Sequence, residues 1–346
     1  MAAPLDAFLA TMVAPSRPVP IEQVVALVRR HYGFESEATR LTGERDENFR
    51  LTADDGAEYV LKIANPAENA AETDLQIAAL LHIEKTDPTL PCPRVLRDRS
   101  GGSRIRFLDE CGADRIARVL TYLPGQLLGT STRSRAQRAA CGRLGARLTL
   151  ALRNFQHPAA RRTIAWDVRH TGHMRCLLEE LPRFPHQSAA RELIKRLVPR
   201  IESQLPLLRH QMVHNDLNPL NILVDPTDPQ CVIGVIDFGD MTDTALIADV
   251  AVGAAELIPP DCSDPRAAHD AVLDVTSAYH ASVPLLASEL ALLGALVAAR
   301  LLMTLVIHEW HVQRNPSSGH FKPLAEDFIR ARIHTADRLL LQEIRP

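Results

Sequence analysis

The stretch HNDLNPLN, residues 214–221, decides the fold of this 346-residue chain. It places Asp216 five residues before Asn221, within a segment rich in turn-forming residues. Sixteen residues after Asn221 comes DFG at 237–239, directly behind the apolar run CVIGVI. Such a run is typical of a buried strand, which delivers the carboxylate of Asp237 to the edge of a site. Either half alone is weak evidence, but together they predict a catalytic loop linked to a metal-binding acid.

The order and spacing match the catalytic loop of protein kinases, H-R-D-x-x-x-x-N followed by DFG, except that Asn215 replaces the arginine. Phosphoryl transfer asks little covalent chemistry of a protein, so positioning and charge neutralisation carry the reaction. Asp216 is therefore the predicted catalytic base, which accepts or orients the hydroxyl of the acceptor. Asn221 and Asp237 are the predicted ligands of Mg²⁺, because both offer hard oxygen atoms.

The chain changes character near residue 123: strand patterns prevail before it, and helical periodicity prevails after it. Strands are expected at 48–52, 59–63, 103–108 and 115–122, and helices at 1–30, 70–83, 133–155, 189–209, 243–257, 266–280 and 286–313. The prediction is an α+β protein with a two-lobe, protein-kinase-like fold. Its small lobe, residues 1–123, would hold a leading helix and an antiparallel sheet that binds the nucleotide. Its large helical lobe, residues 124–346, would hold the catalytic loop, the metal site and the substrate pocket.

A lysine interrupts the predicted strand YVLKI at 59–63. Kinases place a phosphate-binding lysine on a strand of the small lobe, so Lys62 is the predicted contact of the nucleotide phosphates; a surface lysine on a half-exposed strand is the alternative. Its usual carboxylate partner lies on the next helix, where Glu72 and Asp74 are candidates. Gln76 holds the register at which an acid was expected. The partner is therefore left open between Glu72, Asp74 and neither.

The chain resembles the aminoglycoside phosphotransferase and choline kinase superfamily, and within it the hydroxylysine kinases and the kinase domains fused to aminotransferases. The stretches that carry this resemblance are ERDENF at 44–49, YVLKI at 59–63, LTYLPG at 120–125, and residues 213–223 and 235–241. No GxGxxG covers the phosphate loop, where TGERDEN at 42–48 stands instead. The resemblance implies a Mg²⁺-dependent kinase that moves the γ-phosphoryl of GTP or ATP to the hydroxyl of a small amino-acid or amino-alcohol substrate.

The resemblance also implies roles for single residues. The backbone around Thr121 and Leu123 is expected to bind the purine, and Asn48 to contribute to the nucleotide site. Asp240 falls where relatives have a second acid, which assists the metal or the substrate. An aminoglycoside kinase, or one for choline, ethanolamine or homoserine, is the alternative enzyme. A nucleotide-binding pseudokinase scaffold is the alternative that is not an enzyme.

The apolar segment at 290–307 contains a central Arg300, which would be costly at the centre of a bilayer. We therefore expect a buried helix, within which the arginine must be paired. It either binds a substrate carboxylate in a bidentate fork or forms a salt bridge with Asp249 or Glu256.

Trp166 and Asp167 offer an aromatic face and a carboxylate, which suit a substrate ammonium group. Plain packing and a helix cap are the alternative for this pair. With Arg300, the two residues hint at an amino-acid substrate.

Composition excludes few classes of function. The net charge of −3 gives no reason to expect a nucleic-acid or membrane partner, and six widely spaced cysteines favour a reducing cytoplasm. The N-terminus lacks the basic region of a signal peptide. HEWH at 308–311 is one residue short of the HExxH zinc motif, so metal binding is not expected there. The oligomeric state is left open.

Overall fold

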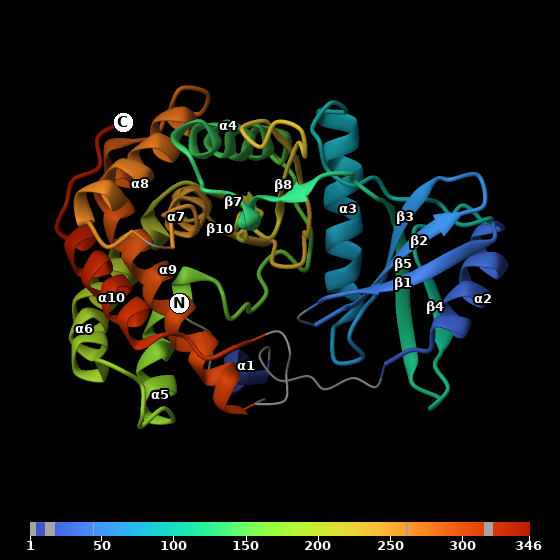
Figure 1. Cartoon of the computed structure of the whole chain (residues 1–346), viewed down its shortest axis with the longest axis horizontal. Coiled ribbons are helices and arrows are strands. Elements are labelled where there is room, and N and C mark those ends of the chain that lie inside the picture. The colour runs from blue at the N-terminus through green and yellow to red at the C-terminus, as the bar shows by residue number, and fades with distance from the viewer. Residues whose placement is uncertain (1–4, 11–17, 44, 261, 315–320) are drawn as a thin grey trace. The chain divides into compact units, whose positions relative to one another are not determined.

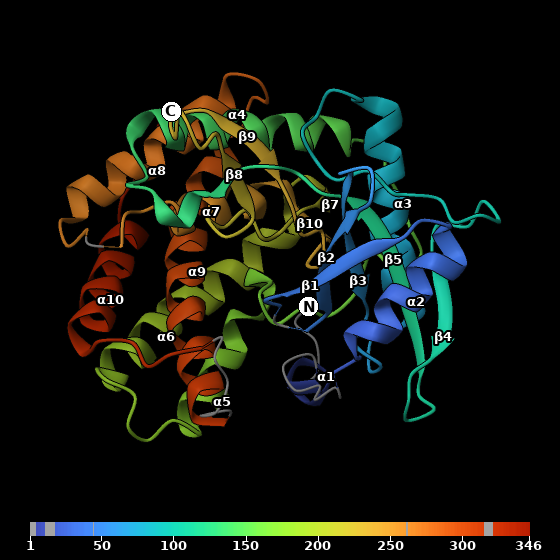
Figure 2. The same cartoon turned by 45° about the vertical axis from the view of Figure 1, so that its right-hand side comes forward.

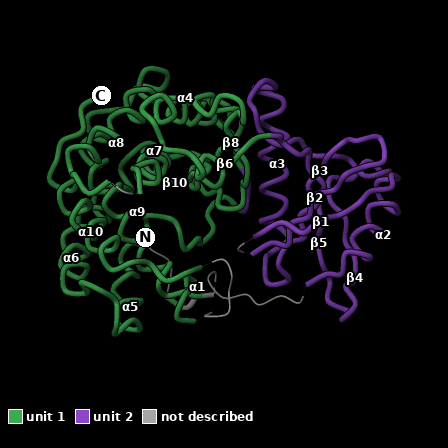
Figure 3. Tube along the Cα trace, viewed as in Figure 1, with its two compact units in different colours: residues 1–9, 125–156, 160–346 green, residues 10–124, 157–159 purple. Residues whose placement is uncertain are grey.

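The computed structural model describes residues 5–10, 18–43, 45–260, 262–314 and 321–346. Two compact units make up the chain (Figure 3). The strand unit comprises Ala10–Pro124 and His157–Ala159, and the helical unit comprises Gly125–Gln156, Ala160–Pro346 and the residues up to Leu9. In the described residues, the leading helix predicted at 1–30 corresponds to two helices. The short α1 (Leu5–Ala10) groups almost entirely with the helical unit, and α2 (Ile21–Tyr32) belongs to the strand unit, where the sequence predicted it. Residues 11–17 of that predicted helix lie outside the described residues.

The strand unit is built on a five-stranded antiparallel sheet of order β1-β2-β3-β5-β4. Its strands are β1 (Ser36–Leu41), β2 (Glu47–Ala53), β3 (Glu58–Ile63), β4 (Ile105–Leu108) and β5 (Asp114–Thr121). The four predicted strands are confirmed as β2, β3, β4 and β5, while β1 was not predicted because most of its residues are polar. The helices α2 (Ile21–Tyr32) and α3 (Ala70–Thr86) lie on opposite sides of this sheet (Figure 1).

Strand alternation gives the sheet one strongly apolar face and a second face on which apolar side chains such as Val60 and Leu120 alternate with charged ones. The apolar face packs on α2 and includes Phe49, Leu61 and Val119, each with no exposed surface. Burying each such side chain contributes about 1.5–3 kcal/mol, which makes the register of the strands hard to shift. Lys62 points to the opposite face, as the sequence predicted.

The helical unit carries the predicted catalytic segments on short strands. Its strands are β6 (Gln126–Leu127), β7 (His210–Val213), β8 (Ile222–Val224), β9 (Val232–Val235) and β10 (Thr242–Ala245). Its longer helices are α4 (Arg135–Ala151), α6 (Gln187–Gln204), α7 (Leu246–Glu256), α8 (Pro265–His280), α9 (Ala287–Arg314) and α10 (Glu326–Leu340), with the short α5 (Met174–Glu179). The helices predicted from periodicity are confirmed with shifted ends, whereas α5 and α10 were not predicted.

The helix α9 forms the centre of the helical unit, where it packs against α6, α7 and α10 (Figures 1 and 2). Among the described residues it is the one helix long and apolar enough to cross a membrane by length and composition. However, 83% of its most apolar window is buried inside the protein, as expected for the core helix that the sequence predicted. The buried Arg300 lies on this helix.

Candidate active site

The predicted catalytic loop begins where β7 ends, and its first residues are held from two sides. The backbone N–H of Asn215 donates to Asp249 Oδ1 on α7 at 2.7 Å, and Asn215 has a φ of 65°. This left-handed conformation is uncommon outside glycine, and asparagine tolerates it better than most residues. On the other side, the ring of the fully buried His214 meets the ring of Phe238 edge-on, with centroids 4.9 Å apart. The loop and the DFG segment are thereby packed together.

The carboxylate of Asp216 is fixed by two amides of its own loop. Asn221 Nδ2 donates to Asp216 Oδ2 at 2.7 Å and to its carbonyl oxygen at 3.0 Å, and Asn218 Nδ2 donates to Asp216 Oδ1 at 2.9 Å. Both hydrogen bonds of Asn221 use its nitrogen, so they direct its carboxamide oxygen elsewhere. The five-residue spacing therefore brings the predicted base and one predicted metal ligand into direct contact.

Antiparallel pairing of β8 with β9 brings Asp237, which follows β9, close to Asn221, which precedes β8. Ile222 lies opposite Val235, and the N–H of Ile236 donates to the carbonyl oxygen of Asn221 at 2.8 Å. Asp237 follows with a φ of 60°, and its Oδ1 accepts from the N–H of Gly239 at 3.0 Å.

An amide oxygen and an exposed carboxylate are the donor set that Mg²⁺ uses when substrate phosphates and water complete its octahedron. Asn221 and Asp237 therefore fit this cation. In the described part of the chain, no three His, Cys, Asp or Glu side chains gather into a metal-binding group. At the HEWH stretch, His308 Nε2 lies 2.6 Å from the carbonyl oxygen of Lys322, and the ring of His311 stacks on Phe321.

Arg300 connects the predicted base to α7. Its Nη2 donates to Asp216 Oδ1 at 3.2 Å, its Nε to Glu256 Oε1 at 2.9 Å, and its Nη1 to the carbonyl oxygen of Trp166 at 3.0 Å. The hydroxyl of Thr304 also donates a hydrogen bond to Glu256 Oε1, at 3.0 Å. Each guanidinium nitrogen thus makes one hydrogen bond within the protein, which uses three of the five N–H donors. The salt bridge with Glu256, one of the two roles that the sequence allowed, is present, and the substrate role stays a prediction.

Of the pair expected to bind a substrate ammonium group, Asp167 is used within the protein, while the role of Trp166 stays a prediction. Asp167 has no exposed surface, caps the short 3₁₀ helix at Val168–His173 and accepts from Arg169 Nε at 2.7 Å. Its carboxylate is therefore a helix cap, which was the alternative left by the sequence. One face of the Trp166 indole is covered by the Arg300 guanidinium, 5.0 Å from the ring centroid.

Acids outnumber bases around the predicted catalytic base. Burial raises the pKa of Asp216 to about 7, with further increases from the charges of Asp240 and Glu256, and Arg300 opposes this shift. Burial also disfavours the ionised Glu256, but the adjacent Arg300 outweighs it and holds the pKa of Glu256 below its usual range. Asp240, predicted as the second acid, is 7% exposed. A base with a pKa near 7 is well matched to proton transfer at neutral pH.

The residues predicted to bind the nucleotide lie in the strand unit. Lys62 Nζ is 4.0 Å from Asp46 Oδ2, a carboxylate that the sequence did not nominate. Asp74, one of the candidates for that role, instead binds Arg104 with a distance of 2.6 Å to its Nε. Gln76 accepts a hydrogen bond from Arg118 Nη2.

The expected purine-binding backbone is only partly available. Thr121 N–H donates to the carbonyl oxygen of Arg94 at 2.9 Å, so this group already has a backbone partner, whereas Leu123 lies just beyond the end of β5. The Asn48 carboxamide oxygen is buried and has no hydrogen-bond partner among the described residues.

Fold and site together define a kinase for small molecules, and comparison with known proteins agrees. The structure superposes on an amicoumacin kinase in complex with AMP-PNP and Ca²⁺ with a TM-score of 0.68, 15% identity, and coverage of 94% of this chain and 95% of that one. It matches a microcompartment-associated aminopropanol kinase with a TM-score of 0.63, 19% identity, and coverage of 92% and 95%. At these identities the likeness shows the fold alone.

The sequence relationship goes further than the fold. Hydroxylysine kinase of Mus musculus is 28% identical over 334 residues, which cover 89% of this chain and 87% of that protein. The model of the phosphotransferase enzyme family (APH) matches residues 37–286. The chain belongs to this phosphotransferase family, whose members transfer phosphate from a nucleoside triphosphate to a hydroxyl group of a small molecule.

Proposed function

We propose that this kinase transfers the γ-phosphoryl of GTP or ATP to the hydroxyl of a small amino acid or amino alcohol, with hydroxylysine as the leading candidate. The observation that carries the proposal is the charge around Asp216: three carboxylates, those of Asp216, Asp240 and Glu256, surround one guanidinium, that of Arg300. A site with this excess of negative charge favours a cationic acceptor. The similarity to hydroxylysine kinase supports an acceptor that carries an amine.

In the proposed reaction, Asp216 orients the acceptor hydroxyl and takes its proton as the oxygen attacks the γ-phosphorus. The bond from the γ-phosphorus to the β,γ-bridging oxygen breaks, and the nucleoside diphosphate leaves with that oxygen. Asn221 and Asn218 hold the carboxylate in place, so little reorganisation is needed during the step. Arg300 keeps the base ionisable despite its burial. Asn221 and Asp237 would hold Mg²⁺, which supplies charge neutralisation for the phosphate oxygens. Lys62 would contact the phosphates from the strand unit.

A coupled assay with matched acceptors tests the substrate. Purified protein with Mg²⁺ and either GTP or ATP is offered 5-hydroxylysine, 5-hydroxynorleucine and lysine, and phosphorylated product is identified by mass spectrometry. Hydroxynorleucine keeps the hydroxyl but lacks the side-chain ammonium, so its kcat/KM should be lower by about 100-fold or more. Lysine, which has no hydroxyl, should give no product.

The same assay separates the alternative acceptors. An aminoglycoside carries several ammonium groups and would also suit an acidic site, and choline, ethanolamine and homoserine each present a hydroxyl near a cationic nitrogen. A kcat/KM for any of these well above that for hydroxylysine would overturn the choice of hydroxylysine. Equal rates with hydroxylysine and hydroxynorleucine would overturn the role given to the acidic surroundings.

We also propose that the protein works in a reducing cytoplasm. All six cysteines are free thiols, and Cys92 and Cys141 are buried. Localisation of a tagged full-length chain in its own cells tests this, and a secreted protein would contradict it.

A further inference from the structure

Two cationic side chains lie next to each other on the mixed face of the sheet in the strand unit, the face opposite α2. In the strand register Asn48 of β2 lies opposite Lys62 of β3, and Lys62 lies opposite Arg118 of β5. Directly opposed residues of neighbouring strands share a face, with Cβ atoms about 4.5–5.5 Å apart. Two like charges in this arrangement repel each other, and Arg118 is only 1% exposed, so water screens its charge poorly. The pair requires an anion.

One carboxylate oxygen meets this requirement. Asp46 Oδ2 lies 3.3 Å from Arg118 Nη2 and 4.0 Å from Lys62 Nζ. Asp46 immediately precedes β2 and stands two residues before Asn48, so strand alternation places both side chains on the same face. The helix α3, which sequence reasoning expected to supply the acid, presents the neutral Gln76 instead, and this side chain accepts from Arg118.

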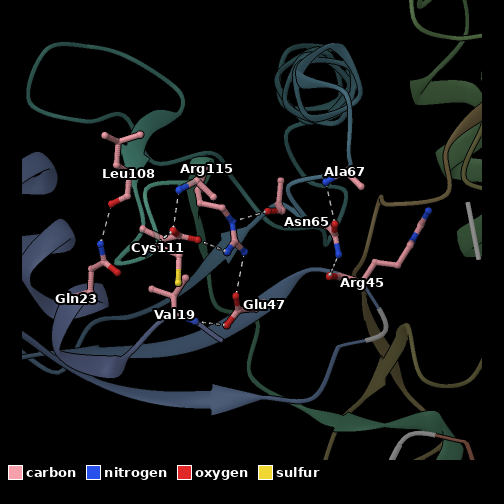
Figure 4. Close-up of polar contacts among 12 residues, drawn as sticks. Val19, Gln23, Arg45, Glu47, Asn65, Ala67, Leu108, Cys111 and Arg115 are labelled. Carbon is pink, nitrogen blue, oxygen red and sulfur yellow. Dashed lines mark hydrogen bonds and ion pairs between the residues drawn. The ribbon is translucent and has the colours of Figure 1, made fainter. Parts of the chain in front are cut away.

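The loop that carries Asp46 is anchored on both sides. Its neighbour Glu47 points to the opposite face, where Oε1 binds Arg115 Nη2 at 3.0 Å and Oε2 accepts from the N–H of Val19 at 2.9 Å (Figure 4). On its other side, the carbonyl oxygen of Arg45 accepts from Asn65 Nδ2 at 3.5 Å (Figure 4). Two consecutive acids thus pair with two buried arginines of β5, one on each face of the sheet.

We propose that Asp46 is the positioning carboxylate of Lys62 and that Arg118 anchors it, so that a strand-entry loop replaces the acid that kinases of this fold place on α3. The inference rests on the proposed phosphate-binding role of Lys62. Asp46 aligns the lysine and does not itself contact the nucleotide. Asp46 lies near two cations, and its single negative charge does not by itself neutralise both of them.

A second acid nearby does not fully cancel the remaining positive charge. Glu68 accepts from Thr73 Oγ1 at 3.2 Å and from Gln76 Nε2 at 3.4 Å. Burial, followed by the charge of Asp46, raises the pKa of Glu68 to about 7. At neutral pH this side chain is therefore only partly ionised.

The chain offers a matched control for testing Asp46. Asp46 and Glu47 are adjacent, each is 12% exposed at the side chain, and each pairs with an arginine of β5 that is 1% exposed. Glu47 also pairs with Arg40 and accepts from the N–H of Val19, so full-length Glu47→Gln should lose at least as much stability as Asp46→Asn in thermal melts. Of these two variants, only Asp46→Asn should weaken the binding of non-hydrolysable ATP and GTP analogues with Mg²⁺. The expected loss of affinity is about 10- to 100-fold, which is typical when a residue that orients a binding group is removed.

Kinetics and further variants make the test decisive. Asp46→Asn should raise KM for the nucleotide and leave KM for the acceptor within about twofold. The reason is that the variant loses an interaction with the nucleotide that is equally strong in the ground state and the transition state. Glu72→Gln and Asp74→Asn should leave nucleotide binding unchanged. If Asp46→Asn does not fold, Asp46→Glu, which keeps the charge but displaces it, should weaken binding, with Glu47→Asp as its control.

The outcomes against the proposal are equally specific. Equal effects of Asp46→Asn and Glu47→Gln would assign Asp46 a purely structural role, and a loss of binding in Glu72→Gln with none in Asp46→Asn would return the role to α3. Arg118→Met, which removes the cation 3.3 Å from Asp46 Oδ2, should weaken nucleotide binding too; unchanged affinity would remove Arg118 as the anchor. Direct nucleotide binding needs no acceptor, so these results stand even if the proposed substrate is wrong.

Discussion

The backbone N–H of Asn215 donates to Asp249 Oδ1 at 2.7 Å, and this contact ties the loop of the predicted base to the helix α7. Asp249 is 2% exposed, and its burial raises its pKa to about 6 although backbone hydrogen bonds from Asn215 and His214 oppose the shift. The contact fixes the loop conformation at a residue whose φ is unfavourable for most side chains. The Asp249 carboxylate therefore holds the loop in place, but burying its charge lowers the stability of the folded protein.

That cost should appear as a pH dependence. Because the pKa of Asp249 is higher in the folded protein than in the unfolded chain, the folded state binds the proton more tightly, and the stability this contributes is lost as the pH rises from about 4 through about 6. In the isosteric Asp249→Asn this titration is absent. Between pH 5 and 7.5 the wild type should therefore lose about 1 kcal/mol of unfolding free energy relative to the variant, measured by denaturant titration. A constant difference across this range would contradict the prediction.

Asp216→Asn should remove the base and leave binding intact. The amide keeps the shape of the carboxylate but cannot take a proton, so kcat should fall by about 100- to 10,000-fold. Nucleotide affinity should change little, as shown by titration with a non-hydrolysable analogue. Asn218→Ala, which removes one hydrogen bond to Asp216 Oδ1, serves as the comparison and should lower kcat far less. Wild-type turnover in Asp216→Asn would rule out the assigned role.

Removal of Mg²⁺ should stop the reaction, and the two predicted ligands should respond differently. Chelation with EDTA should abolish turnover, and added Mg²⁺ should restore it. Asp237→Asn should raise the Mg²⁺ concentration for half-maximal rate by about tenfold or more. Asn221→Ala should do the same and also lower kcat at saturating Mg²⁺, because Asn221 holds the carboxylate of Asp216. An unchanged Mg²⁺ requirement in both variants would exclude this metal site.

Arg300 and Glu256 should be coupled in stability. Arg300→Met leaves the buried Glu256 and Asp216 without their cation, which should cost about 3–5 kcal/mol of unfolding free energy. The double variant Arg300→Met/Glu256→Gln should lose less than the sum of the two single changes, since the second change removes one of the unpaired charges. Additive losses in denaturant titrations would show that the salt bridge contributes nothing to stability. The same variants report on substrate recognition through KM for the acceptor.

Gly142→Ala should destabilise the protein, although glycine-to-alanine changes inside helices are usually stabilising. A Cβ there would lie 2.3 Å from the carbonyl oxygen of Val275, where α4 crosses α8. Glycine-to-alanine changes inside helices normally gain about 0.5–1 kcal/mol. Gly142→Ala should instead lose about 1–3 kcal/mol, because two backbones must move apart. In Gly145→Ala of the same helix the nearest atom is Leu217 Cδ1 at 3.3 Å, which can shift, so this control should lose much less in a thermal melt.

Local sequence patterns were enough to predict the α+β fold and the arrangement around Asp216. Spacing alone places Asn221 in contact with Asp216, and a strand that ends in DFG brings Asp237 alongside, because both distances along the chain are short. Periodicity likewise identified the long buried helix around Arg300. The polar strand β1 was not predicted because it has no apolar alternation, and α5 was not predicted because its six residues are too short for a periodic pattern.

Contacts between distant residues had to come from the tertiary structure. For Arg300, the sequence predicted either a substrate carboxylate or an acid of α7 as the partner. The packing of α9 on α7 brings the guanidinium to Glu256, which is 44 residues away along the chain. The partner of Lys62 was sought on α3, whereas the strand register brings Arg118 beside the lysine and Asp46 between them. An arginine inside the apolar run IARVL at 116–120 was the available signal, since a buried cation requires an anion. The chain sequence thus determined which residue types carry the chemistry, and the three-dimensional packing decided which charges meet, because a pair separated along the chain forms only where the fold closes the distance.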